Sequence, residues 1–392
     1  MTDLKLDFQD TAIAFSSKSD KELKKTARLF SLMNKKWLVD IGSKVGLAAF
    51  KYKLPFAATM VEATIFDLFC GGKTLLDCQP NIDKLRDFQV NTILDYGAEG
   101  KDTEEDFNLT MNENMRGIDF AFHNPSIPAI STKLTGLTYT PLLEKIHAGL
   151  TLTTEEEHQK QSLLKRVDVI CNKAAERGVA VFIDAEESWF QKPIDDIVTL
   201  MMSRYNKNRP IVYNTFQMYR TDRLAFLKES YSLAKSGGYI LGAKIVRGAY
   251  MDKERTRAAE MGYPSPIQPD KLSADADYNT AIRFSIDHYE HIAFCNASHN
   301  TTSSQLMASY IHEKGLAKDH PHFMFCQLYG MSDNLTFNLA KAGFRVAKYM
   351  PYGPVRDVIP YLIRRTQENA AVTGDLSREY EMILKEVKRR GI

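Results

Sequence analysis

The sequence has little cysteine and no long apolar run. Its five cysteines are widely spaced and none lies in a Cys-x-x-Cys pair, which is typical of reduced thiols and not of a disulfide framework. The most apolar stretch, residues 54–70, is interrupted by Glu62 and Asp67 and is short for a bilayer span. The N-terminus has neither the apolar segment of a signal peptide nor the arginines of a transit peptide. We expect a cytoplasmic protein, peripheral on the inner membrane face at most.

The sequence also has no large excess of positive or negative charge, and it lacks the common nucleotide-binding motifs. The 51 Lys and Arg residues nearly balance 49 Asp and Glu, and no zinc-finger or RGG pattern occurs, so we expect no nucleic-acid partner. The histidine pairs His288/His291 and His320/His322 lack a third ligand at suitable spacing, so we expect no metal site. No strand-like run is followed by a G-x-G-x-x-G or Walker loop.

The first 84 residues predict a helical N-terminal arm. Apolar side chains recur with helical spacing over residues 21–38, and Ser19 or Asp20 is a suitable N-cap. These apolar positions are Leu23, Ala27, Phe30, Met33 and Trp37.

From residue 85 to the C-terminus, short β-rich runs alternate with longer helical stretches such as 155–177, which stops at Gly178. The eight runs are 90–96, 129–134, 179–184, 211–215, 239–246, 292–295, 322–326 and 345–349. Eight such units predict an α/β fold, a (β/α)₈ barrel, with an open doubly wound sheet as the alternative. The predicted organisation is therefore an arm over 1–84 and a barrel over 85–392.

Most of the predicted strands end in a side chain that can bind or react. A (β/α)₈ barrel brings such strand ends to one face, where its active site lies. The residues concerned are Lys133, Asp184, Gln217, Lys244, Arg247, Tyr250, Ser298, His299, Asn300, Gln327, Tyr329 and Tyr349.

A predicted helix after the last strand carries Arg364, Arg365 and Glu368. Glu368 lies three and four residues beyond the arginines, so it can brace either one. Two guanidinium groups suit a small carboxylate, although a solvated ion-pair helix has the same spacing. Lys133 is a candidate carboxylate ligand or Schiff-base amine, or a lysine that reaches solvent from a strand end. Asp184 follows a buried strand and is expected to fix Lys133 or an arginine.

Six strings, in order along residues 90–372, together resemble the proline dehydrogenase family. They are 183–187 (IDAEE), 243–250 (AKIVRGAY), 262–266 (GYPSP), 297–300 (ASHN), 328–331 (LYGM) and the C-terminal RR-x-x-EN at 364–369. The resemblance is to monofunctional, bacterial-like members. It implies a distorted TIM-like barrel with FAD over its mouth and the oxidation of L-proline to Δ1-pyrroline-5-carboxylate, with hydride passing from C5 to the flavin N5 and electrons continuing to quinone.

The resemblance also implies roles for individual residues. Arg364, Arg365 and Lys133 would bind the proline carboxylate, Glu368 would orient the arginines, and Asp184 would hold the Lys133 side of the site. Tyr250, Leu328 and Tyr349 would pack around the proline ring. The flavin contacts would be Gln217, Lys244, Val246, Gly248, Lys271, Ala297, Ser298, His299 and Asn300. Lys244 stands where the large bifunctional relatives have arginine, which keeps the charge but loses the bidentate geometry.

Three alternatives remain at this point. Hydroxyproline oxidation on the same scaffold requires a smaller residue at Tyr349. A Schiff-base aldolase would use Lys133 or Lys244. A non-catalytic barrel would bind small anions through the arginine pair. The implied partners are L-proline, quinone, a membrane surface touched by the arm or by the basic residues 385–390, and a separate pyrroline-5-carboxylate dehydrogenase.

Overall fold

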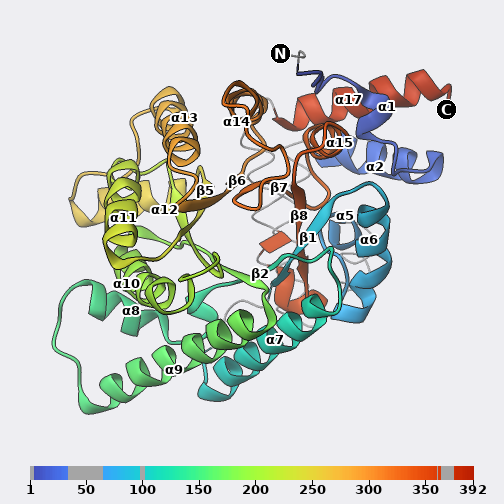
Figure 1. Ribbon diagram of the computed structural model, residues 1–392. Coiled ribbons are helices and arrows are strands. Elements are labelled where there is room, and N and C mark those ends of the chain that lie inside the picture. The colour runs from blue at the N-terminus through green and yellow to red at the C-terminus, as the bar shows by residue number, and fades with distance from the viewer. Residues whose placement is uncertain (1–3, 34–64, 98–101, 360, 363–374) are drawn as a thin grey trace. The chain divides into compact units, whose positions relative to one another are not determined.

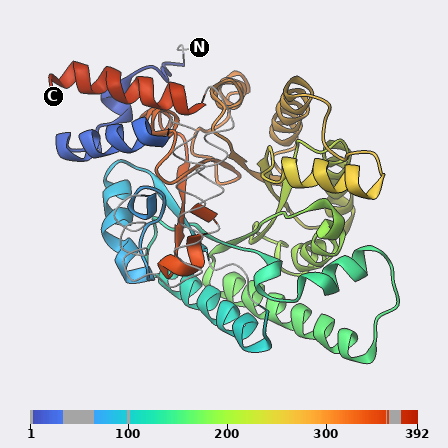
Figure 2. The ribbon, with the colours of Figure 1, turned by 180° about the vertical axis from the view of Figure 1, so that it is seen from behind.

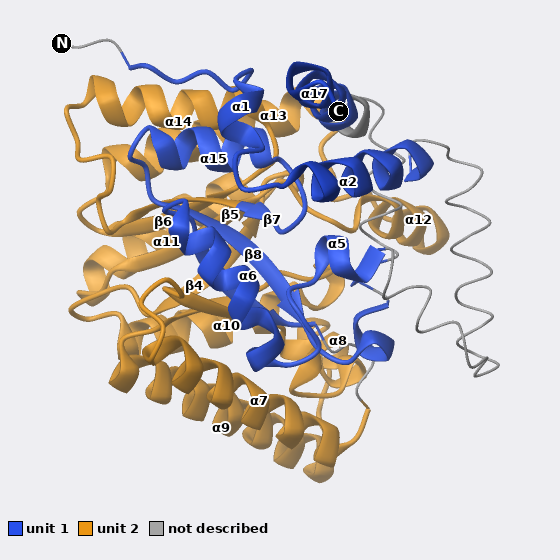
Figure 3. Ribbon diagram, turned by 90° about the vertical axis from the view of Figure 1, so that its right-hand side faces the viewer, with its two compact units in different colours: residues 1–100, 327–392 blue, residues 101–326 orange. Residues whose placement is uncertain are grey.

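The computed structural model describes residues 4–33, 65–97, 102–359, 361–362 and 375–392. The chain divides into two compact units, one formed by residues 1–100 and 327–392 and the other by residues 101–326 (Figure 3). Each unit is described by itself. The predicted boundary between an arm over 1–84 and a barrel over 85–392 stays a prediction.

The sheet is a closed barrel with strand order β1 to β8, as predicted (Figure 1). The strand bounds are β1 Asn91–Tyr96, β2 Ala129–Thr132, β3 Ala180–Ile183, β4 Val212–Gln217, β5 Leu241–Val246, β6 Ile292–Ala297, β7 Phe323–Leu328 and β8 Val346–Tyr352. Pairing is parallel from β2 through β7 and between β1 and β8. Each strand overlaps one of the eight predicted runs, because buried parallel strands are near-continuous apolar segments.

The unit of residues 101–326 holds β2 to β6, most of β7 and the helices that connect them. Their bounds are α7 Glu104–Phe122, η2 Leu134–Gly136, α8 Thr140–His147, α9 Thr154–Arg177, α10 Ser188–Tyr205, α11 Arg223–Gly237, α12 Met251–Met261, α13 Lys271–Asp287 and α14 Thr301–Glu313. Figures 1 and 2 both show α7 beside α9. A capping box of Thr153 and Glu156 starts α9, and Gly178 ends it at a φ of 70°.

The other unit pairs β1 with β8 and adds the helices near the two chain ends. Their bounds are α1 Thr11–Ala14, α2 Asp20–Met33, α5 Asp67–Phe69, α6 Leu75–Asp87, α15 Asp333–Lys341 and α17 Asp375–Arg390. Ser19 caps α2, as predicted: its hydroxyl accepts from the Glu22 backbone N–H, and the Glu22 carboxylate accepts from the Ser19 N–H.

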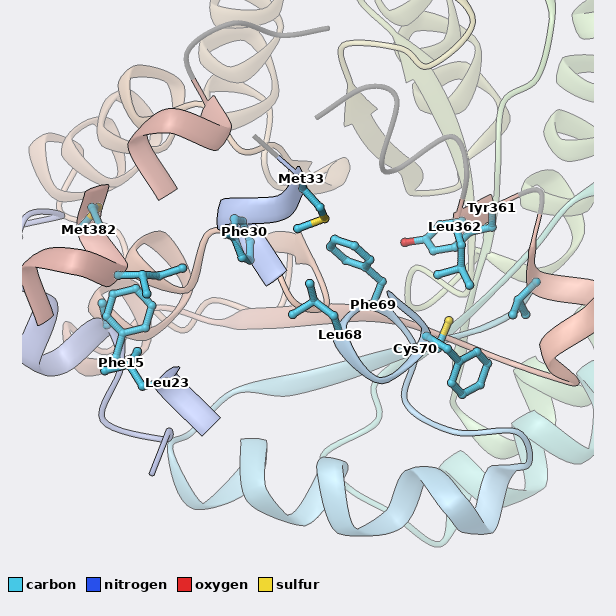
Figure 4. Packing of buried hydrophobic residues seen from close by; sticks show 14 of the residues in the cluster. Phe15, Leu23, Phe30, Met33, Leu68, Phe69, Cys70, Tyr361, Leu362 and Met382 are labelled. Carbon is cyan, nitrogen blue, oxygen red and sulfur yellow. The ribbon is translucent and has the colours of Figure 1, made fainter. Parts of the chain in front are cut away.

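The core of this unit joins both chain ends (Figure 4). The predicted face of α2 is buried: Leu23 is 0% exposed and Phe30 is 1% exposed. These side chains share a cluster with Phe15, Phe69 and Met382, so α17 packs against α2 and α1. Trp37, the last position of the predicted face, lies outside the described residues.

Candidate active site

The carboxyl ends of β2 to β6 gather the polar side chains of the 101–326 unit. Parallel barrel strands end on one face, so residues far apart in sequence meet there. Ser131 and Lys133 come from the end of β2, Asp184 follows β3, and Gln217 ends β4. Lys244 belongs to β5. The predicted site residues of this unit are therefore placed on successive strand ends.

A buried ion pair links two of these ends. Lys244 Nζ lies 2.6 Å from Asp184 Oδ1, and the two side chains are 7% and 14% exposed. Ser131 Oγ donates to the same carboxylate oxygen at 3.0 Å. Burial by itself would lower the pKa of Lys244, but the charge of Asp184 and its hydrogen bond outweigh burial, so the pKa is raised. The structure thus pairs Asp184, which was predicted to support the substrate site, with Lys244, which was predicted to contact the flavin.

Lys133 follows β2 directly, is half-buried and forms the N-cap of the short helix η2. Its positive charge acts on Glu186, an acid in the loop after β3. Glu186 is 4% exposed, and burial raises its pKa to about 7 against the lowering effects of Thr135 and Lys133. Sequence reasoning gave Glu186 no role. The sequence did contain a feature that could have indicated a role: Glu186 is the second acid of the IDAEE string, which follows a buried strand.

Gln217 is tied to the backbone of the same loop. Its Nε2 donates to the Glu186 carbonyl at 2.7 Å, and the side chain is 2% exposed. The Glu186 N–H donates to Gln191 Oε1 at 2.7 Å. The loop after β3 is therefore held from both β4 and α10 by buried hydrogen bonds.

Arg247, just beyond β5, organises the start of α14. Its guanidinium donates to Asp275 at 2.7 Å, to Ser298 Oγ at 2.8 Å and to Ser303 Oγ at 3.0 Å. Asn300 caps α14 by accepting from the Ser303 N–H at 2.9 Å. The predicted cofactor residues Ala297, Ser298, His299 and Asn300 thus run from the last residue of β6 to the N-cap of α14, where Arg247 donates hydrogen bonds to two serines.

The remaining predicted residues of this unit lie near Arg247. Val246 ends β5, and Gly248 has a φ of 137°, where a Cβ would lie 2.4 Å from the Tyr219 ring. Tyr250 is the half-buried N-cap residue of α12. Lys271 starts α13 and pairs with Asp275 at 2.6 Å on the surface.

Two predicted substrate residues belong to the other unit. Leu328, the last residue of β7, is half-buried, and Tyr349 on β8 is 6% exposed. The Tyr349 carbonyl accepts from the Tyr329 N–H at 2.8 Å. The predicted carboxylate clamp, Arg364 and Arg365 with Glu368, lies outside the described residues.

Comparison with known proteins gives consistent matches. The family model described as proline dehydrogenase matches residues 78–378. The chain is 32% identical to proline dehydrogenase 1, mitochondrial, of Dictyostelium discoideum, over 98% of this chain and 75% of that protein. It is 38% identical to the human protein of the same name over 61% of this chain, and that alignment spans 40% of the human protein. The bacterial-like character that we expected is not borne out, because these relatives are mitochondrial proteins.

The fold has solved counterparts. Proline utilization A from Bdellovibrio bacteriovorus, inactivated by N-propargylglycine, superimposes with a TM-score of 0.74 at 20% identity. That match covers 92% of this chain and 38% of the bacterial chain. Among the described residues, no helix has both the length and the apolar character to cross a membrane.

Proposed function

The chain belongs to the proline dehydrogenase family, so it is an oxidoreductase of proline metabolism, and we propose that it oxidises L-proline to Δ1-pyrroline-5-carboxylate with FAD. The match to the family model carries this proposal. The structure supports it with cationic and polar side chains at the carboxyl ends of β2 to β6, which is the active-site face of a (β/α)₈ barrel.

The residues of the 101–326 unit suit FAD. Gly248 and Ala249 are exposed residues that follow the fixed cation Arg247, and Ser298 and Asn300 stand at the N-terminus of α14. Exposed backbone groups, a guanidinium and a helix N-terminus are the donors that a phosphate-bearing cofactor requires. We propose that this segment and the residues after β6 hold the cofactor, with Gln217 and Lys244 on its ring side.

The other task of the protein is to orient the substrate. The bound FAD would supply the acceptor for the hydride at C5 of proline. Lys133, Arg364 and Arg365 are proposed to anchor the substrate carboxylate, with Glu368 bracing the arginines. Asp184 holds Lys244 by the buried ion pair, and we propose that it keeps this side of the pocket rigid. Tyr250, Leu328 and Tyr349 are proposed to pack on the proline ring, because a fixed substrate converts binding energy into rate.

The geometry argues against a Schiff-base aldolase that uses Lys244. A nucleophilic lysine needs a lowered pKa to supply a neutral amine, whereas the pKa of Lys244 is raised by Asp184. We further propose that electrons leave to a quinone at a membrane surface and that a separate dehydrogenase consumes the product. These two steps rest on the family resemblance.

Steady-state turnover tests the proposal. The purified protein, supplied with FAD and a soluble quinone analogue, should oxidise L-proline and release a product that reacts with o-aminobenzaldehyde. trans-4-Hydroxy-L-proline should be a much poorer substrate because Tyr349 is a full-sized side chain. Equal or faster turnover of hydroxyproline would overturn the assignment of proline as substrate.

A further inference from the structure

The buried acid Glu186 lies among residues that the proposed function uses, yet no role has been assigned to it. It follows β3 two residues after Asp184, and its carboxylate reaches the segment after β2. Thr135 donates to it twice, from the backbone N–H to Oε1 at 3.2 Å and from the hydroxyl to Oε2 at 2.5 Å. Both donors stand two residues beyond Lys133, so Glu186 fixes the segment that carries this lysine.

The backbone of Glu186 is equally constrained. Its N–H donates to Gln191 and its carbonyl accepts from Gln217. Gln191 in turn donates to Asp195 at 2.9 Å, and Asp195 forms a buried ion pair with Arg223 at 2.7 Å. The backbone that carries this carboxyl group is therefore held from two sides, and Thr135 holds the carboxylate itself.

The charges around Glu186 come from several elements. Lys133, at the end of β2, lowers the pKa of Glu186, whereas the adjacent Glu187 raises it. Glu187 is paired with Lys253 of α12 at 2.9 Å. On the β3 and β5 side stand Asp184 and Lys244, which are paired with each other, and on the α10 side stands Asp195.

We propose that Glu186 is a positioning residue whose protonation state tunes the net attraction that the Lys133 side of the site exerts on the substrate carboxylate. This inference rests on the proposed function. A ligand carboxylate held by Lys133 is a second negative charge near Glu186, so binding favours the protonated form of the buried acid. By linkage, carboxylate binding then takes up a proton near pH 7, and affinity falls as pH rises through that region, because the pKa of Glu186 is about 7.

A ligand that has a carboxylate but no amine allows this proton uptake to be measured without titration of the ligand. Tetrahydrofuran-2-carboxylate is proline with the ring nitrogen replaced by oxygen, so its carboxylate is ionised at every pH above 5.5 and it has no other titrating group. Isothermal titration calorimetry of the FAD-loaded protein, in two buffers of different ionisation enthalpy, gives the dissociation constant and the number of protons taken up.

For the unsubstituted protein we expect the uptake of a fraction of a proton at pH 7. The dissociation constant should rise roughly tenfold from pH 6 to pH 8.5, which is the size expected for repulsion between two like charges in a partly buried site. Glu186→Gln should abolish the uptake and flatten the pH dependence. The matched control Glu187→Gln should keep the uptake and move its midpoint to lower pH, because the Glu187 charge raises the pKa of Glu186.

Thr135→Val provides an independent test that leaves the acid in place. The hydroxyl of Thr135 lowers the pKa of Glu186, so its removal should move the midpoint of the proton uptake to higher pH. Uptake that persists in Glu186→Gln would assign the proton to another group, such as His299, and would overturn the inference. Binding without any uptake in the unsubstituted protein would overturn it as well. A complete lack of binding at every pH would instead contradict the proposed function.

Discussion

Lys244 Nζ lies 2.6 Å from Asp184 Oδ1, so a cation from β5 and an acid that follows β3 form one buried ion pair. The residues are 60 positions apart in the chain. Isolated charges of this kind are unstable in a protein interior, because neither has water to replace its partner. Loss of either partner is therefore expected to destabilise the fold and also to disturb the proposed active site.

Asp184→Ala should destabilise the protein strongly. It leaves Lys244 buried without its carboxylate, which costs about 3–5 kcal/mol in the free energy of unfolding. The double variant Asp184→Ala, Lys244→Met should recover part of that loss because the buried positive charge is gone. Urea denaturation followed by circular dichroism measures both.

The control for this experiment is a solvent-exposed pair of the same type. Lys192 and Asp196 lie 2.6 Å apart on α10, with side chains 67% and 62% exposed. Asp196→Ala should change the free energy of unfolding by less than about 1 kcal/mol. Equal losses in Asp184→Ala and Asp196→Ala would show that burial of the Lys244 pair has no energetic weight.

Glu379→Gln should stabilise the protein at pH 8 but not at pH 5. Burial and the charge of Asp333 raise the pKa of Glu379 from 4.5 to about 7. The folded state therefore binds more protons than the unfolded state between these values, and stability decreases as pH rises through them. The glutamine is neutral throughout and can still accept from the Ser332 N–H, which lies 3.0 Å from Glu379 Oε2.

The Tm of Glu379→Gln and of the unsubstituted protein, measured at both pH values, tests this prediction. Glu381→Gln, at an exposed position of the same helix α17, is the control for the loss of one carboxylate. A Tm gain for Glu379→Gln of the same size at pH 5 and pH 8 would mean that Glu379 does not titrate in this range.

Gly248→Ala should weaken flavin binding and lower the Tm. At a φ of 137° an L-residue is strained, and its Cβ would overlap the buried Tyr219 ring. Gly262→Ala is a suitable control, because Gly262 also has a positive φ, 72°, but a Cβ there has nothing within 4 Å. The control should cost only about 1–2 kcal/mol of backbone strain and retain the flavin. Equal flavin content in both variants would argue against a role for Gly248 beside the cofactor.

Tyr349→Ser should admit hydroxyproline, since a smaller side chain leaves room for the 4-hydroxyl group. The kcat/KM for hydroxyproline should rise relative to that for proline, by tenfold or more. Tyr349→Phe keeps the ring and should retain the preference for proline. If Tyr349→Ser changes neither kcat/KM, Tyr349 does not line the pocket.

Local signals explain why so much of the fold could be predicted from the sequence. A strand such as β3 is a short apolar run, and α9 carries its own start signal at Thr153 and stop signal at Gly178. These features need no knowledge of distant residues. The same holds for the buried face of α2, where Leu23 and Phe30 recur with helical spacing.

Pairings between distant residues were not predictable in the same way. Asp184 was expected to serve the Lys133 side, and nothing in its sequence neighbourhood indicates Lys244 as a partner. Glu186 and Thr135 are 51 residues apart, and only the parallel arrangement of β2 and β3 brings them together. The raised pKa of Glu186 is a property of that burial and cannot be read from a string of acids.

The absorption spectrum of the purified protein, recorded before and after addition of L-proline without oxygen or another acceptor, tests the central claim most directly. The account predicts the visible absorption bands of an oxidised flavin, and their bleaching when proline is added, because the substrate would reduce the bound flavin. Flavin bands that persist in the presence of proline, or a protein that binds no flavin even when FAD is supplied, would contradict it.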